Sequence, residues 1–198
     1  MHWPLITLGI MLIHSAVVSA ADLYATAGAG NLAQVEAILA QGGNADAPGR
    51  NDETPLMAAA LADQPKIAEI LLAHGADILA RNAGGFTPLH AAAYSGSMSA
   101  ALLLLDKGAL LEDTNNKAHA SPLMVAADEG HADVVELFIA RGADLNSLDK
   151  EGFSPLSQAW SKKHMDVVRL LKQHGATCQP VEVLGGDNYY QSCVKAGQ

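Results

Sequence analysis

The stretch Thr87-Pro88-Leu89-His90-Ala91-Ala92-Ala93 decides how the chain folds, because three close variants of it occur elsewhere in the sequence. The variants occupy residues 54–60 (TPLMAAA), 121–127 (SPLMVAA) and 154–160 (SPLSQAW). Their leucines lie at positions 56, 89, 123 and 156, so they are separated by 33, 34 and 33 residues. Self-similarity at a fixed period of this length predicts an array of stacked structural repeats.

The chemistry of the stretch predicts that each copy begins a helix. A Ser or Thr hydroxyl caps a helix N-terminus, and a following Pro fits the first helical turn because its missing N–H is not needed there. The alanines that come next allow neighbouring helices to approach closely. One unit of this size cannot bury its own apolar face, so the units must stack on one another.

A Thr-Pro-Leu-His-x-Ala core at about 33-residue spacing is the signature of the ankyrin repeat, and the chain resembles the ankyrin-repeat family over residues 23–176. The resemblance implies an all-α ankyrin-repeat solenoid of about five helix-turn-helix repeats, with β-hairpin loops and a C-terminal capping tail. The first repeat is partial, since Leu23 lies 33 residues before Leu56 without a preceding Thr-Pro. The array is predicted over 22–177, with repeats at about 22–45, 46–78, 79–111, 112–145 and 146–177, and the cap over 178–198.

The N-terminal segment predicts export. Residues 1–21 contain no Asp, Glu, Lys or Arg, and the apolar run from Leu5 to Ile13 is followed by small residues up to Ala20. This layout predicts a secretory signal peptide over 1–20 that is cleaved after Ala20. The absence of Lys and Arg from its start leaves two alternatives open, an uncleaved membrane anchor or a different start codon.

Two features distinguish the C-terminal end. Trp160 occupies the place of Ala60, Ala93 and Ala127 in the earlier repeats, and a tryptophan does not fit a helix contact built for alanine. We therefore expect that no further repeat stacks there and that the tail covers this end. Both cysteines, Cys178 and Cys193, lie in the tail.

In an exported chain the two cysteines predict a disulfide. Closing the loop of about 16 residues between them stabilises a fold by about 3 kcal/mol in the chain-entropy model. In a reducing cytosol they would remain two thiols. The cysteines and the N-terminus together predict a periplasmic or secreted protein, and assigning it to a bacterium rests on similarity to small exported ankyrin proteins.

Charge and composition exclude several function classes. The net charge is −9, from 21 acidic and 12 basic residues, and no basic stripe is present. Nucleic-acid affinity depends mainly on Lys and Arg, so no nucleic-acid partner is expected. The acidity favours a basic partner surface, and the alternative is that it serves only solubility.

The sequence predicts neither catalytic residues nor a metal or other cofactor. Of the eight histidines, His90 and His131 match positions at which the ankyrin family carries structural histidines. His119 and His164 have no His or Cys at metal-ligand spacing beside them. An enzyme built on the acidic pair Asp128 and Glu129 is the weakest alternative.

The resemblance places protein binding at the hairpin tips and just after the paired alanines, on the concave side. Phe86, Tyr94 and Phe153 stand out because aromatic residues are enriched at interface hot spots and form only 5% of this chain. The alternative is that Phe86 and Phe153 only fill space between adjacent hairpins. We expect a monomer that binds another exported protein, whether to inhibit it, stabilise it or hold it on a scaffold. The residues predicted to bind the partner are Arg50, Asn51, Glu53, Phe86, Tyr94, Lys117, His119, Asp128, Glu129, Lys150, Phe153 and Lys162.

Overall fold

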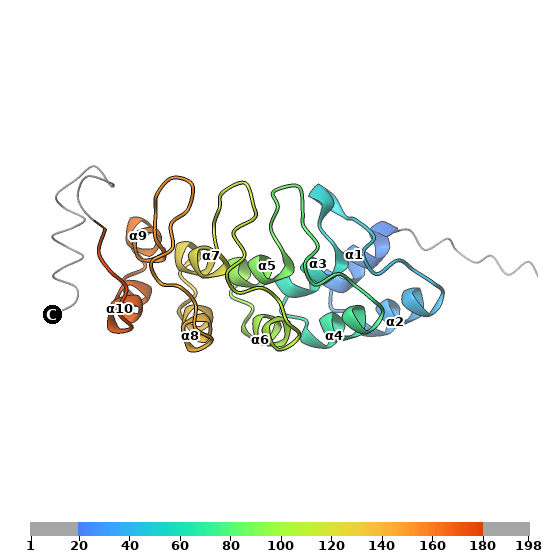
Figure 1. The fold of residues 1–198 in the computed structure, drawn as a ribbon. Coiled ribbons are helices and arrows are strands. Elements are labelled where there is room, and N and C mark those ends of the chain that lie inside the picture. The colour runs from blue at the N-terminus through green and yellow to red at the C-terminus, as the bar shows by residue number, and fades with distance from the viewer. Residues whose placement is uncertain (1–19, 180–198) are drawn as a thin grey trace, which may run out of the picture.

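The computed structural model describes residues 20–179, and within this range the chain forms ten α-helices and one short 3-10 helix. The helices lie in two parallel rows, with the odd-numbered helices in one row and the even-numbered helices in the other (Figure 1). The predicted all-α repeat solenoid is thereby confirmed. The odd-numbered, inner helices are α1 (Ala20–Gly28), α3 (Pro55–Leu61), α5 (Pro88–Ser95), α7 (Pro122–Glu129) and α9 (Pro155–Ser161). The even-numbered, outer helices are α2 (Leu32–Ala40), α4 (Pro65–Ala73), α6 (Met98–Asp106), α8 (Ala132–Ala140) and α10 (Met165–Gln173).

The inner helices begin where the repeated stretch predicts. Proline is the first residue of α3, α5, α7 and α9. The hydroxyls of Thr54, Ser121 and Ser154 each accept a hydrogen bond from the backbone N–H three residues later, at 3.3 Å. Such caps satisfy N–H groups that the helix itself leaves without an acceptor.

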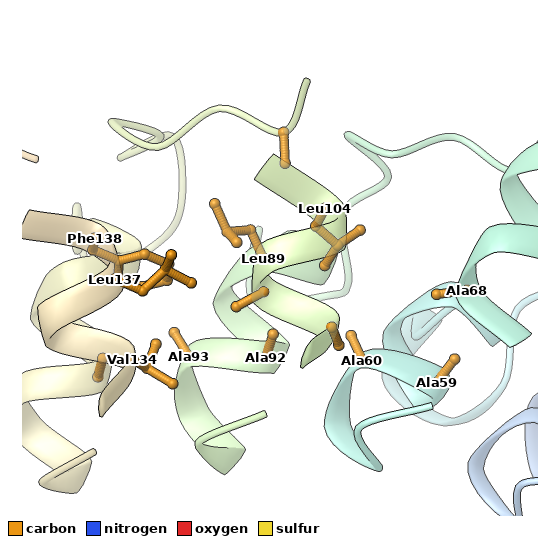
Figure 2. Packing of buried hydrophobic residues seen from close by; sticks show 14 of the residues in the cluster. Ala59, Ala60, Ala68, Leu89, Ala92, Ala93, Leu104, Val134, Leu137 and Phe138 are labelled. Carbon is orange, nitrogen blue, oxygen red and sulfur yellow. The ribbon is translucent and has the colours of Figure 1, made fainter. Parts of the chain in front are cut away.

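The core consists of columns of equivalent residues that run along the stack. The repeat leucines Leu56, Leu89, Leu123 and Leu156 are at most 1% exposed. The alanines near the ends of the inner helices, such as Ala60 and Ala93, are fully buried, and Figure 2 shows that those of α3 and α5 lie between the helices. Small side chains there let each inner helix pack directly on the next.

The long connections between successive repeats are called here finger loops; they span 41–54, 74–87, 107–121 and 141–154 and project from the inner row (Figure 1). No residue in the range 20–179 belongs to a β-strand, so the finger loops lack the strand pairing that the predicted β-hairpins would have. The second and fourth finger loops are each closed by a backbone hydrogen bond, from Asn82 N–H to the Phe86 carbonyl at 3.1 Å and from Asp149 N–H to the Phe153 carbonyl at 2.9 Å. The first finger loop instead contains the 3-10 helix η1 (Arg50–Asp52).

The ends of the chain are described only in part. Trp160 is half-buried and packs against the core, as does Cys178, but the predicted cap from residue 180 onward and Cys193 lie outside the described residues. The disulfide and the covering of this end by the tail therefore remain predictions. The signal peptide also remains a prediction, because residues 1–19 lie outside the described range. In the stretch from 20 to 179 no helix combines the length and apolar character needed to cross a membrane.

Candidate partner-binding groove

A groove of about 550 Å³ lies between the finger loops and the inner helices α3, α5, α7 and α9. Clefts that bind ligands commonly measure about 300–1,000 Å³. Tyr94 of α5, with 57% of its surface exposed, is the largest exposed side chain in it. The other apolar and aromatic side chains of the lining are Met57, Leu61, Phe86, Ala91, Ala118, Ala120, Met124 and Val125.

The groove is built from columns, because each repeat places the same position at the same point along the stack. Ala91, Val125 and Gln158 form one column, and Leu61, Tyr94 and Asp128 form another. The repeated backbone thus supplies a regular surface on which only the side chains differ from repeat to repeat. The chemistry of the groove is set by these differences.

The charged groups of the lining are all carboxylates: Glu53, Asp128 and Glu129. Glu53 accepts a hydrogen bond from the Tyr24 hydroxyl at 2.5 Å, and this bond together with burial raises the pKa of Tyr24 to about 12. Asp128 lies 3.3 Å from the ammonium of Lys162. Glu129 is exposed and forms no salt bridge within residues 20–179.

His90 is the buried polar centre of the groove wall. Its Nδ1 lies 3.2 Å from the backbone N of Thr87 and 2.8 Å from the Thr87 hydroxyl, and its Nε2 lies 3.0 Å from the Ala120 carbonyl and 3.1 Å from the Asp113 carbonyl. Only an imidazole that accepts at Nδ1 and donates at Nε2 satisfies all four groups. Burial lowers the pKa of His90 below 6.5, so the ring is neutral. The neutral ring joins the start of α5 to the next finger loop, and Phe86 packs edge-on against it with ring centroids 5.4 Å apart.

An ion pair fixes the second and third finger loops relative to each other. The Arg81 guanidinium donates to both carboxylate oxygens of Asp113, at 3.0 and 2.6 Å, and also to the Gly85 and Asn115 carbonyls at 3.0 Å. The hydrogen bonds from Arg81 lower the pKa of Asp113, although burial opposes the shift, and they raise the pKa of Arg81. These bonds tie the second finger loop, which carries Phe86, to the third finger loop.

The fingertips are joined by backbone hydrogen bonds. Ala83 N–H donates to the Asn51 carbonyl at 2.8 Å, Lys117 N–H to Gly84 at 3.0 Å and Lys150 N–H to Ala118 at 3.0 Å. Their backbones thus hold neighbouring loops together, while the side chains of Asn51, Lys117 and Lys150 are exposed.

Two histidines, His131 and His164, contact the backbone at the groove residues Tyr94 and Asp128. The Nε2 of His131 lies 3.0 Å from the carbonyl of Tyr94, and the Nε2 of His164 lies 2.9 Å from the carbonyl of Asp128. A side chain at Gly130 would place a Cβ 2.5 Å from Nδ1 of His164, so glycine is needed for this close approach. The sequence alone left His164 without a role, although its 33-residue spacing from His131 was a usable signal.

The family model described as ankyrin repeats (three copies) matches residues 23–115 and 109–181. The chain belongs to the ankyrin-repeat family. None of the curated proteins matches the chain. Ankyrin repeats form protein–protein interaction modules, and the family is typically non-catalytic. Among residues 20–179 no three His, Cys, Asp or Glu side chains gather where they could hold a metal ion.

The ankyrin array brings five of the twelve predicted binding residues into one groove. Glu53, Phe86, Tyr94, Asp128 and Glu129 line it. Lys162 lies beside it through its ion pair with Asp128. The residues that lie outside the lining are Arg50, Asn51, Lys117, His119, Lys150, Phe153 and Lys162.

His119 has a backbone role in this ankyrin array. It occupies the position of Gly85 and Gly152 in the neighbouring finger loops and has a φ of 53°, in the left-handed region that glycine favours. Asn116 supports this conformation, because its Oδ1 accepts from the N–H groups of Ala118 and Ala120, both at 3.1 Å. The neighbouring finger loops contain the same side-chain-capped turn, in which Asn82 Oδ1 accepts from Gly84 and Phe86 and Asp149 Oδ1 accepts from Glu151 and Phe153.

Part of the groove was not recognised from the sequence, because some of its residues lie within the repeat signature. Met57 and Met124, each 1% exposed, take the place of the signature histidine, and Val125 and Gln158 occupy the variable position that follows it; these four residues were not selected for binding from the sequence. All four line the groove. A comparison of the repeats column by column gives the missing signal, since a column that varies among Ala, Val and Gln is not held to one size by packing. The remaining lining residues that sequence reasoning did not single out for binding are Asn82, Thr87, His90, Ala91 and Ala120.

Proposed function

We propose that this ankyrin-repeat protein binds another exported protein through the groove between its finger loops and inner helices. The observation that carries the proposal is the exposed ring of Tyr94 in a groove that apolar side chains such as Leu61, Phe86 and Val125 also line. Large aromatic side chains are frequent anchors of protein interfaces. The hydrogen bonds that join neighbouring finger loops reduce the ordering cost of binding a partner.

A paired capture experiment tests the proposal. The chain is used as bait for an extracytoplasmic extract in parallel with a Tyr94→Ala bait, a Phe86→Ala bait and a Leu110→Ala bait. Leu110 is the matched control, because it is 51% exposed and lies outside the groove. We expect a partner that is retained by the wild-type and Leu110→Ala baits and lost by Tyr94→Ala. A partner that all four baits retain would place the interface elsewhere and refute the groove as the binding site.

The captured partner also distinguishes the possible roles. An inhibitor lowers the partner's own activity when it is added in excess, whereas a stabilising protein leaves the activity intact and raises the partner's melting temperature. A scaffold does neither and links the partner to a third protein. The sequence and the groove favour none of the three.

Export is the second part of the proposal, and it is supported by the uncharged residues 1–21 and the two tail cysteines. The mass of the chain isolated from cells tests it: cleavage after Ala20 leaves Ala21 as the first residue. If residues 1–20 are retained, the alternative is an ankyrin scaffold tethered to a membrane. Alkylation before and after reduction, followed by the same mass measurement, tests the bond between Cys178 and Cys193.

A further inference from the structure

We propose that the groove recognises an arginine side chain presented by an apolar segment of the partner protein. Because it concerns the same groove, this assignment rests on the proposed function and adds the chemistry of the partner. It follows from the charges of the lining, from the position of two of them, Asp128 and Glu129, on α7, and from the exposed ring of Tyr94.

The lining carries three carboxylates and, among the described residues, neither Lys nor Arg. His90, the only imidazole of the lining, is buried and neutral. A partner segment that enters the groove therefore meets three carboxylates, of which only Asp128 is paired with a cation, Lys162 at the edge of the groove. An acidic segment is repelled, and a cationic side chain is attracted.

The position of Asp128 and Glu129 strengthens the attraction. Both lie in the last turn of α7, where the helix dipole presents its negative end. Carboxylates at that end are unfavourable for the chain alone, and a cation bound beside them removes the unfavourable interaction. Lys162 offsets only Asp128, and its own side chain is 54% exposed, so a stronger ligand can replace it.

Tyr94 adds a preference for arginine over lysine. Its exposed ring belongs to the same lining as the two carboxylates, in the repeat before them. A guanidinium can stack on an aromatic ring and donate to carboxylates at the same time, which a compact ammonium does less well. The half-buried side chain of Val125, one repeat along, suits the hydrocarbon stem of arginine and its apolar neighbours.

Peptide selection on the full 198-residue chain tests the assignment. Phage-displayed random 12-residue peptides are selected in parallel on the wild-type chain and on the Glu129→Gln, Asp128→Asn, Tyr94→Ala and Glu136→Gln variants. Glu136 of α8 is the matched control for charge removal, because it is exposed and lies outside the groove. The dissociation constant of the most enriched peptide is then compared with those of its Arg→Lys and Arg→Gln versions.

We expect an enriched arginine flanked by apolar residues on the wild-type and Glu136→Gln chains. The Arg→Gln peptide should bind at least about tenfold more weakly, because charge-assisted hydrogen bonds are stronger than neutral ones, and Glu129→Gln should remove most of the difference between the two peptides. Enriched peptides without a basic residue that are lost on Tyr94→Ala would overturn the arginine assignment and leave the groove as the binding site. Peptides that bind all variants equally, or no enrichment at all, would overturn both the assignment and the proposed function.

Discussion

Replacement of His90 by methionine removes one donor from the buried centre of the groove wall while it preserves the rest of the repeat. Methionine occupies the equivalent position in two other repeats, as Met57 and Met124, and Met124 Sδ accepts from the backbone N–H of Ser121 at 3.4 Å. The acceptor role of His90 is therefore retained in His90→Met. The donor at Nε2 is lost, although Ala120 keeps a hydrogen bond from Asn116 Nδ2 at 2.7 Å.

The Asp113 carbonyl receives no other hydrogen bond within residues 20–179. An acceptor left without a donor in a buried site costs about 1–3 kcal/mol, and Asp113 is only 6% exposed. We therefore expect His90→Met to lower the free energy of unfolding by about 2 kcal/mol at pH 7.5. Urea titrations followed by circular dichroism measure this difference, with the exposed His74→Gln as the control, for which we expect a change below about 0.5 kcal/mol.

The same comparison has a defined pH dependence. The pKa of His90 is lowered in the folded chain, so protonation favours the unfolded state once the pH falls below the unfolded value of about 6.5. The stabilising contribution of His90 is thus fully present above pH 6.5 and decreases as the pH approaches the folded pKa. One proton changes the free energy of unfolding by at most about 1.4 kcal/mol per pH unit. The difference in unfolding free energy between the wild-type chain and His90→Met should therefore be smaller at pH 5.5 by up to that amount. A deficit below 0.5 kcal/mol at pH 7.5, or one that does not change with pH, would refute the assignment of His90 as a neutral bridge.

Three further substitutions test other parts of the fold by urea titration. Lys163→Gly should stabilise the chain by about 0.5–1 kcal/mol, because Lys163 is exposed and its φ of 67° is unfavourable for any residue but glycine; unchanged or lower stability would contradict this. Gly130→Ala should destabilise by at least about 2 kcal/mol, because its φ of 82° and the contact with His164 both oppose a Cβ; a neutral result would show that the histidine moves away at little cost. Asp113→Asn should lower the free energy of unfolding by about 2 kcal/mol at pH 7, since Arg81 loses its charged partner. That deficit should narrow as the pH falls below about 3.8, because the stabilisation from the lowered pKa of Asp113 is present above that value and lost below it; a deficit independent of pH would contradict the ion pair.

The repeated stretch was sufficient to predict the fold. Its Ser/Thr-Pro pairs locate the start of the inner helices, and its Leu and Ala columns identify the core, because both features depend on local chemistry that recurs in every repeat. The strands expected in the finger loops were wrong, since Asn82 and Phe86 form one closing bond and no ladder. A single sequence does not separate a short hairpin from a turn closed in this way.

The groove was predicted only in part for a physical reason. Exposed positions such as Tyr94 and Glu129 stand out because they break the pattern of apolar core residues. Met124 and Val125 do not stand out, because the same side chains suit a core and a groove equally well. The contacts of Arg81 and His90 join residues more than 20 positions apart, and their geometry depends on how the repeats stack.

Hydrogen exchange on the complex with the captured partner tests the central claim most directly. The account predicts slower amide exchange in α5 and α7 and in the finger loop around Phe86 when the partner is bound. The outer helices α6 and α8 should exchange at the same rates with and without the partner. Protection confined to the outer helices or to residues beyond 179 would contradict the groove as the binding site.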